Sequence, residues 1–208
     1  MAAGRTYGGM SADERRADRR VRLVRAAREL LESGDTAQVT VTAVCRRAKL
    51  SERYFYESFT DRGALLGGVY DDFADEYIDA VTARIASAGD LTDRIHASVT
   101  VAPELAATYP GMRHVLGRDA DEGEAARARA HIARKVIDLY LANRALLFRD
   151  IDIDPLDAEL AVRIMVGGGL DLAFAYCQGR FDVSAAELAT RTAKLLEPLT
   201  ESLSSGRL

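Results

Sequence analysis

Apolar residues recur at helical spacing along most of the chain. Between residues 13 and 33, one apolar stripe follows the i, i+4, i+7, i+8 spacing that places side chains on a single helix face. The stripe consists of Leu23, Ala27, Leu30 and Leu31. Gly34 follows it, at the position where a helix commonly ends. The pattern predicts an amphipathic helix over residues 13–33.

Two short helices are predicted next, joined by a link of about three residues. Thr40 is a favourable N-cap, and the apolar positions after it again repeat at i, i+3, i+4 and i+7. Ser51 caps the third helix, in which Phe55 and Phe59 lie one turn apart and face inward. Helices joined this closely must cross steeply, which is the geometry of a helix-turn-helix.

Turn residues divide the remaining chain into longer helical segments. A fourth helix begins near Gly63, capped by Thr60 or Asp61, and continues to Ser87. Further helices are predicted near residues 91–108, 112–118, 124–148, 156–179 and 185–203. The sequence therefore predicts an all-α protein of about nine helices. We expect an N-terminal arm at residues 1–12, a small three-helix domain at 13–62 and a larger helical bundle at 63–208.

Composition limits the classes of protein that fit this pattern. With 48% hydrophobic and 29% charged residues, the composition is that of a folded soluble protein. No continuous apolar run is long enough for a bilayer, and no apolar signal core begins the chain, so neither membrane insertion nor export is expected. The two cysteines, Cys45 and Cys177, lie within helical patterns, which favours the reducing cytoplasm. A buried structural thiol and a redox-active thiol remain alternatives for each cysteine.

The charge is distributed unevenly along the chain. Residues 1–62 carry 13 lysines and arginines against nine acidic residues, a net charge of +4. Residues 63–208 carry 15 against 23, a net charge of −8. An acidic body with a basic N-terminal domain would repel DNA over most of its surface and present one end to it.

The third helix exposes an unusual set of side chains. Once its inward positions are assigned to the core, its outer face holds Glu52, Arg53, Tyr54, Tyr56, Glu57 and Ser58. A solvated helix seldom exposes two tyrosines. A helix in the major groove uses tyrosine hydroxyls on phosphates and arginine or serine on base edges, so the residues favour a DNA-contacting helix.

Residues 40–66, TVTAVCRRAKLSERYFYESFTDRGALL, resemble the DNA-binding motif of the TetR family of bacterial transcription regulators. The motif has a Thr-capped helix, a turn, a short recognition helix with a Tyr-x-x-Phe pattern and a Leu-Leu helix start. The matching positions are Thr40, Val44, Ala48, Leu50, Ser51, Phe55, Tyr56, Phe59, Ala64, Leu65 and Leu66. The specific similarity covers about residues 18–68, and the rest agrees in length and helical character.

The resemblance implies two kinds of DNA contact. Phosphate contacts are expected from Thr40, Ser51, Tyr54, Tyr56 and Arg62. Base contacts are expected from Glu52, Arg53, Glu57 and Ser58, because Glu accepts from cytosine and Arg pairs with guanine. For Glu52 and Glu57, a solvent-facing role in helix stability is an equal alternative.

The motif departs from the family pattern at three positions. Lys49 occupies the turn where the family usually has glycine, so it is expected to adopt a positive φ at a cost of roughly 1 kcal/mol. Its charge could recover that energy near a phosphate, so we include it among the phosphate contacts. Gly63 replaces an acidic residue, and Arg62 stands where a lysine is usual.

The arginines between Arg15 and Arg28 remain ambiguous in the sequence. A solvated helix face that adds general electrostatic attraction is one interpretation. An arm that enters the minor groove, as in homeodomains, is the other.

For residues 63–208 the resemblance implies an effector pocket and a homodimer interface formed by the last two helices. The pocket is expected near Phe73, Tyr77, Val99, Tyr109, Met112, His114, Tyr140, Phe174 and Cys177. The interface is expected at Leu160, Ile164, Gly168, Leu172, Leu188, Leu195, Leu196 and Leu199. Few charged residues would anchor a ligand there, so a small, largely apolar effector is expected. The glycines Gly167–Gly169 favour either close helix packing or close approach of the ligand.

Enzyme, cofactor and metal signatures are missing from the sequence. It contains no phosphate-binding glycine loop, no Gly-x-Ser-x-Gly elbow and no His-Glu-x-x-His motif. Asp150, Asp152 and Asp154 begin like a calcium loop, but proline follows where that loop needs glycine. We therefore expect a ligand-responsive repressor that releases a palindromic operator, with no cofactor. The alternative is a helical small-molecule binder or enzyme with a vestigial helix-turn-helix.

Overall fold

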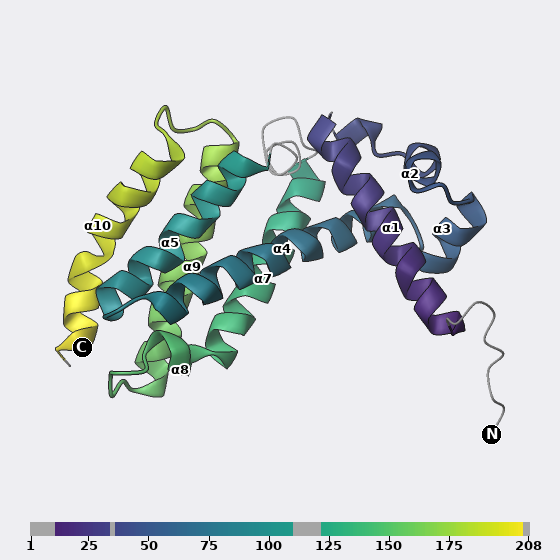
Figure 1. Cartoon of the computed structure of the whole chain (residues 1–208). Coiled ribbons are helices and arrows are strands. Elements are labelled where there is room, and N and C mark those ends of the chain that lie inside the picture. Colours follow the sequence, from purple (N-terminus) through teal and green to yellow (C-terminus); the bar gives the residue numbers. More distant parts are fainter. Residues whose placement is uncertain (1–10, 34–35, 110–121, 206–208) are drawn as a thin grey trace, which may run out of the picture. The chain divides into compact units, whose positions relative to one another are not determined.

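The computed structural model describes residues 11–33, 36–109 and 122–205, and these residues form helices without any β-strand (Figure 1). The all-α prediction is therefore confirmed. The predicted arm at 1–12, apart from its last two residues, and the predicted helix at 112–118 lie outside the described residues. The chain forms two compact units: the first ends at Asp71 and the second begins at Asp72.

The first unit contains α1 (Ala12–Ser33), a short 3-10 helix η1 (Thr36–Gln38), α2 (Val41–Ala48), α3 (Glu52–Ser58) and the first part of α4 (Arg62–Ser87). The predicted cap of α2 is confirmed, because the Thr40 side chain accepts a hydrogen bond from the amide of Ala43 at 3.2 Å. The carboxylate of Asp61 accepts from the amide of Ala64 at 2.8 Å and caps α4. The predicted division at residues 62 and 63 stays a prediction, since the contact boundary falls within α4.

The core of the first unit is built from the apolar stripes that the sequence pattern predicts. Leu23 and Leu31 of α1, Val44 of α2 and Phe55 of α3 are all fully buried. Phe59, which follows α3, is 4% exposed and packs against the Phe55 ring, with 5.9 Å between ring centroids. The long helix α1 and the two short helices α2 and α3 thus share one apolar centre, and their remaining faces stay available for polar contacts.

The second unit is a bundle of α5 (Leu91–Thr108), α7 (Glu122–Ala142), α9 (Pro155–Cys177) and α10 (Ala185–Ser204), with the short helix α8 (Arg144–Leu147). In this unit α5 packs against both α9 and α10, and α7 packs against the other side of α9 (Figure 1). By length and composition alone α9 could cross a bilayer, with a mean hydropathy of 1.5 in its most apolar window. The central helix of a soluble bundle has the same composition.

One helix prediction in the second unit is wrong. A single helix was expected over residues 124–148, but α7 ends at Ala142 and α8 begins at Arg144. Asn143 lies between them in a non-helical conformation, and its side-chain amide donates to the carbonyl of Leu139 at 3.0 Å. The same carbonyl also accepts from the backbone amide of Asn143 at 2.9 Å, so the side chain adds a second donor at the end of α7, a local bond that favours a helix end at a short polar residue.

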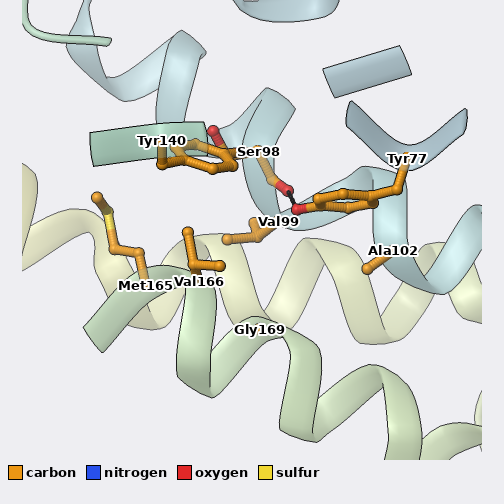
Figure 2. A pocket seen from close by; sticks show the side chains of 8 residues that line it. All are labelled: Tyr77, Ser98, Val99, Ala102, Tyr140, Met165, Val166 and Gly169. Atoms are coloured by element: carbon orange, nitrogen blue, oxygen red, sulfur yellow. Dashed lines mark hydrogen bonds between the residues drawn. The ribbon is translucent and has the colours of Figure 1, made fainter. Parts of the chain in front are cut away.

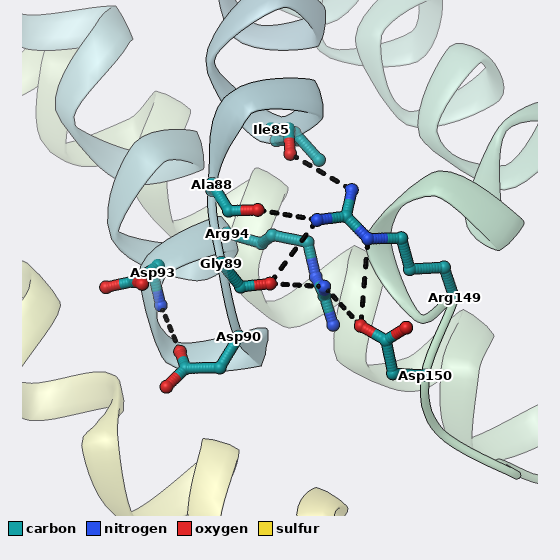
Figure 3. Close-up of polar contacts among 8 residues, drawn as sticks. All are labelled: Ile85, Ala88, Gly89, Asp90, Asp93, Arg94, Arg149 and Asp150. Atoms are coloured by element: carbon teal, nitrogen blue, oxygen red, sulfur yellow. Dashed lines mark hydrogen bonds and ion pairs between the residues drawn. The ribbon is translucent and has the colours of Figure 1, made fainter.

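A polar cluster fixes the connection between α4 and α5 to the loop before α9 (Figure 3). Arg94 is only 1% exposed, and its guanidinium donates to the carbonyl of Gly89 at 2.9 Å and to Asp150 at 2.7 Å. Arg149 donates to the carbonyl of Ala88 at 2.5 Å and so satisfies the C-terminal end of α4. Asp150 therefore compensates a buried charge in the second unit.

Candidate nucleic-acid interface and ligand cavity

The outer face of α3 is exposed in the way that the sequence predicts. Tyr54 is 40% exposed and Tyr56 is 59% exposed, whereas Phe55 between them is fully buried. The side chain of Arg53 is 85% exposed. The tyrosines are therefore not part of the core, and α3 presents a continuous surface of hydroxyl and guanidinium groups.

The arginines of α1 hold the C-terminal end of α3. Arg16 donates two hydrogen bonds to the backbone carbonyl of Glu57, at 3.1 and 2.7 Å, and Arg20 donates to the carbonyl of Ser58 at 3.2 Å. The last carbonyls of a helix have no partner within the helix, and the negative end of the helix dipole favours a cation there. The guanidinium of Arg19 also lies 4.7 Å from the centre of the Tyr54 ring. Neither interpretation of the arginine run anticipated this structural role.

Glu57 links α1 to the exposed arginine of α3. One carboxylate oxygen lies 3.1 Å from Nε of Arg53, and the other lies 3.5 Å from Arg19. The bond to Nε holds Arg53 along the helix and leaves its two terminal nitrogens outside that bond. Glu57 is thus already paired, and a base contact by its carboxylate would compete with both arginines. Arg53 is the base-reading candidate that this arrangement favours.

Glu52 also has a partner within the first unit. Its carboxylate accepts a hydrogen bond from the hydroxyl of Thr42 at 2.9 Å, and this bond joins the first turn of α3 to α2. The contact gives Glu52 a structural role beside its predicted base contact. Ser58 likewise bonds within its own helix, to the carbonyl of Tyr54 at 3.0 Å.

The predicted phosphate contacts include a group at the start of α2. The Nε atom of Arg62 donates to the carbonyl of Val39 at 2.9 Å, which holds the first residue of α4 beside Thr40. The Thr40 hydroxyl accepts its capping bond and still has a proton to donate. Ser51 occupies the N-cap position of α3 without a side-chain capping bond, so its hydroxyl is not used there.

A cavity in the second unit lies among α4, α5, α7 and α9 (Figure 2). Its volume is ≈ 10 Å³, which is close to the space that one water molecule requires. The lining residues are Tyr77, Ser98, Val99, Ala102, Tyr140, Met165, Val166 and Gly169. A second cavity of ≈ 20 Å³ lies on α4, α7 and α8, and Tyr140 lines both. In this conformation the bundle is therefore almost closed around Tyr140.

Three of the residues predicted for the pocket line the first cavity: Tyr77, Val99 and Tyr140. Four others do not line it: Phe73, Tyr109, Phe174 and Cys177. Of these four, all but Tyr109 are buried, and the Tyr109 ring packs against Phe73 with 6.0 Å between centroids. Met112 and His114 lie outside the described residues. Gly169, for which close approach of a ligand was one of two alternatives, also lines the cavity. Ser98, Ala102, Met165 and Val166 were not predicted, because small and aliphatic residues of a cavity wall have the same pattern as core residues.

The polar groups of the cavity are neutral. The Tyr77 hydroxyl donates to the carbonyl of Ser98 at 3.3 Å (Figure 2). The Tyr140 hydroxyl is buried and forms no hydrogen bond of ordinary length among the described residues, although the side chains of Tyr77 and Ser98 lie near enough to influence its pKa. Burial raises the pKa of Tyr140 above its ordinary value and raises the pKa of Tyr77 further. Both side chains can therefore form hydrogen bonds with a ligand, and neither offers a charge to it.

An apolar stripe runs along the outside of α9. Leu156, Leu160 and Ile164 are 63%, 48% and 59% exposed, and their spacing places them on one helix face. Gly168 continues this face and is also exposed. On α10, Leu195 is 80% exposed. We call these five residues the α9–α10 stripe.

The other residues predicted for the dimer interface are less exposed. Leu172, Leu196 and Leu199 are partly exposed. Leu188 is only 7% exposed and belongs to the core of the second unit. The surface available to a partner therefore centres on the α9–α10 stripe.

The three glycines of α9 are not required by packing within the described part of the chain. A Cβ atom added at Gly167, Gly168 or Gly169 would meet no other atom within 4 Å. Each glycine in a helix interior costs up to about 1 kcal/mol relative to alanine. No described helix of this chain packs closely against the glycines, so the expected close packing is not found within the second unit.

Comparison with known proteins independently supports the interpretation of α3 as a DNA-contacting helix. Residues 23–69 match the sequence model of "Bacterial regulatory proteins, tetR family". The chain is 26% identical over 136 residues to the nucleoid occlusion factor SlmA of Marinomonas sp. (strain MWYL1), covering 65% of this chain and 68% of that protein.

Solved structures share the fold over most of the chain. The TetR family repressor AlkX from Dietzia sp. strain DQ12-45-1b, implicated in biodegradation of n-alkanes, superposes with a TM-score of 0.63 at 16% identity, covering 89% of this chain and 96% of AlkX. The regulator FadR from Bacillus subtilis, in complex with stearoyl-CoA, gives a TM-score of 0.59 at 14% identity, covering 85% of this chain and 96% of FadR. The exposed recognition helix and the match at residues 23–69 agree: the first unit carries the DNA-binding domain of the TetR family of bacterial regulatory proteins, and the protein is a DNA-binding transcription regulator.

Proposed function

We propose that the protein is a dimeric, non-enzymatic, cytoplasmic repressor that releases a palindromic operator when a small, largely apolar effector binds. The observation that carries the DNA-binding part is the outer face of α3, where Arg53, Tyr54 and Tyr56 are exposed. Arg16 and Arg20 hold the end of this helix from α1. A recognition surface that is ordered before binding loses less conformational entropy when DNA binds.

The proposed DNA contacts divide into positioning and reading groups. Thr40, Ser51, Tyr54, Tyr56, Arg62 and Lys49 contact phosphates in this proposal. Arg53 reads a base edge, because its guanidinium is exposed and is oriented by Glu57. Glu52, Glu57 and Ser58 keep a secondary base-reading role, since each is already hydrogen-bonded within the unit.

A dimer is supported by the α9–α10 stripe. Monomeric proteins rarely leave a continuous row of large apolar side chains in water. Leu156, Leu160 and Ile164 form such a row, and Gly168 would let the backbone of a partner helix approach closely. A two-fold pairing of these helices also gives two recognition helices, which is what a palindromic operator requires.

The effector is proposed to bind at the Tyr140 cavities and to open them. Their walls are mainly apolar, and their tyrosines are neutral, so they favour a neutral or apolar ligand portion. AlkX is implicated in n-alkane biodegradation and FadR binds stearoyl-CoA, which supports an apolar ligand for this fold. Because α4 contributes residues to both units, a change at Tyr77 has a direct covalent route to the DNA-binding unit. By reciprocity, operator DNA should weaken effector binding by the same factor.

Selection of bound sites from random DNA tests the proposal. We expect a palindrome whose half-site centres lie about 34–36 Å apart, one helical turn. Repeating the selection with Arg53→Ala should flatten the preference at one base pair per half-site, by roughly 1–3 kcal/mol. If the wild-type protein binds no DNA, the alternative of a helical small-molecule binder or enzyme with a vestigial helix-turn-helix replaces this proposal.

A further inference from the structure

A basic cleft lies in the first unit, between the middle of α1 and the C-terminal end of α2. Its volume is ≈ 200 Å³, whereas the cavities beside Tyr140 measure ≈ 10 and ≈ 20 Å³. Four of its seven lining residues are basic, namely Arg22, Arg25, Arg47 and Lys49, and one is acidic, Glu29. We call this site the α1–α2 cleft.

Two of the four cationic side chains, those of Arg47 and Arg22, already bond to partners at the wall of the cleft. Nε of Arg47 lies 2.6 Å from the carboxylate of Glu29, so these two charges neutralise each other. Arg22 donates to the backbone carbonyl of Ala48 at 2.7 Å, which fixes its position without neutralising its charge. Arg22 also forms an ion pair with the carboxylate of Asp18, with 3.7 Å between the two groups. The wall of the cleft is therefore ordered, and the net positive charge of the cleft comes from its other two cations, Arg25 and Lys49.

The other two cations are uncommitted. Within the part of the chain that the structure describes, the side chains of Arg25 and Lys49 form no hydrogen bond or ion pair, and both residues are exposed. Arginine offers a fork of donors that matches a phosphate group, and lysine adds a mobile point charge. The α1–α2 cleft thus has two free donors in front of a fixed arginine.

Lys49 occupies its place in the cleft at an energetic cost. Its backbone is left-handed, with φ 54° and ψ 46°, and no other non-glycine residue in the described part of the chain has a positive φ. Glycine would form the same turn without the steric penalty of a Cβ atom. The side chain is exposed, so the burial of apolar surface does not offset the strain. The feature that lysine supplies and glycine would not is a positive charge beside the cleft.

We propose that the α1–α2 cleft is a phosphate-binding site in which Arg25 and Lys49 contact the phosphate oxygens and Arg22 supports them from the wall. This inference goes beyond the proposed contacts of the helix-turn-helix, because Arg22 and Arg25 belong to α1. Two sources supply the same chemistry: a backbone phosphate of DNA beside the half-site, and a small phosphorylated molecule.

The first arm of the test uses inorganic phosphate. The melting temperature is measured as phosphate replaces chloride at constant ionic strength, for the wild type and for Arg25→Ala, Lys49→Gly and Arg46→Ala. Arg46 is exposed on α2, near Lys49 in the sequence, and does not line the cleft, so it is the matched control. We expect phosphate to raise the melting temperature by a few degrees in the wild type and in Arg46→Ala. Arg25→Ala and Lys49→Gly should lose at least half of this rise.

Lys49→Gly also separates binding from folding. Without phosphate this variant should melt about 2 °C above the wild type, because glycine relieves the left-handed strain. A variant that is more stable and yet responds less to phosphate is not explained by damage to the fold. If Lys49→Gly melts lower and the phosphate response is unchanged, the lysine has a structural role only and the inference is wrong.

The second arm measures how operator affinity depends on salt. Arg25→Ala and Lys49→Gly should each reduce the slope of log K against log salt by about one unit if the phosphate belongs to DNA, and Arg25→Lys should retain the slope. A phosphate response without a slope change assigns the cleft to a small phosphorylated molecule. A slope change without a phosphate response assigns it to the DNA backbone. If neither arm distinguishes the cleft variants from their controls, no phosphate binds there. The first arm needs no operator, so a phosphate response that depends on Arg25 and Lys49 would support the site even if the repressor proposal fails.

Discussion

In the first unit the candidate contact residues are exposed and mostly paired before any ligand arrives, whereas in the second unit the candidate ligand residues are buried around almost no free space. Arg53 projects from α3 and is oriented by Glu57. Tyr140 is 5% exposed and its hydroxyl forms no hydrogen bond of ordinary length among the described residues. One site is prepared for a ligand of fixed shape, and the other must change shape to admit one.

This difference fits the two ligands that we propose. Double-stranded DNA has nearly fixed groove geometry, so a preorganised surface loses little entropy on binding it. An effector that regulates must stabilise a conformation other than the one that binds DNA, since a ligand with equal affinity for both states shifts nothing. A closed cavity with an unsatisfied hydroxyl is suited to this requirement, because the open state becomes favourable only when a ligand fills it.

The largest expected effect comes from separating the proposed dimer. Ile164→Glu and Leu195→Glu place charges on the α9–α10 stripe, and burying a charge without a partner is strongly unfavourable. We expect monomers by light scattering and at least about a hundredfold loss of operator affinity, because each monomer contacts a single half-site. Val21→Glu is the control, since Val21 is 64% exposed on α1 and is not part of the stripe. A wild-type protein that is monomeric at micromolar concentration would contradict the dimer proposal.

A second prediction concerns the buried charge of the second unit. Asp150→Ala removes the carboxylate from Arg94, whose side chain is 1% exposed, so the guanidinium loses its counter-ion. Asp150 itself is 63% exposed, so water compensates in part and we expect a loss of about 1–3 kcal/mol in the free energy of unfolding. Chemical denaturation measures the change, with Asp152→Ala as the control because Asp152 is an exposed carboxylate in the same loop. Equal stability of the two variants would show that water replaces the Asp150 contact completely.

The contrast between the two units also explains which parts of the fold and of the sites could be predicted from the sequence. Helix positions followed from apolar spacing, and the caps at Thr40 and Asp61 are where short polar residues precede apolar runs. The helix at 124–148 was predicted without its break, because at Asn143 the chain can either continue the helix or end it with a side-chain bond added to the Leu139 carbonyl, which already accepts the Asn143 backbone amide. Propensity alone does not decide between them.

Site residues were predictable where they are exposed and unpredictable where they surround a cavity. Tyr54 and Tyr56 could be identified because a helix that faces only solvent seldom exposes two tyrosines. The wall residues Ala102, Met165 and Val166 could not be identified, since a cavity results from how side chains pack and is not marked by any particular residue type. The pairing of Arg16 with the end of α3 was also missed, because its partner is a backbone carbonyl that any residue could supply.

The third prediction concerns a substitution that weakens the preorganisation of α3. Arg16→Ala removes two hydrogen bonds to the carbonyl of Glu57, and we expect the first unit to lose about 1 kcal/mol of stability. Operator affinity should fall about fivefold for all sequences, with the base preference unchanged, because the orientation of the whole helix is affected. Thermal melting and fluorescence anisotropy measure the two effects. Arg46→Ala, which removes an exposed charge elsewhere, should leave the stability unchanged; a similar loss in both variants would mean that general charge, not the position of α3, is responsible.

The prediction with the smallest expected effect concerns whether the closed cavity is the effector site. Gly167→Ala and Gly169→Ala add the same methyl group to α9, and neither methyl meets an atom within 4 Å. Both variants should gain up to about 1 kcal/mol of stability, because alanine is the better helix former. Gly169 lines the cavity and Gly167 does not, so a neutral apolar probe such as 1-decanol should bind Gly169→Ala about fivefold more weakly and Gly167→Ala as tightly as the wild type. Calorimetric titration of the three proteins measures the difference. If both variants bind the probe equally weakly, the cause is the stiffness of α9 and not the cavity wall. If neither variant binds it more weakly than the wild type, the effector site is not at Tyr140.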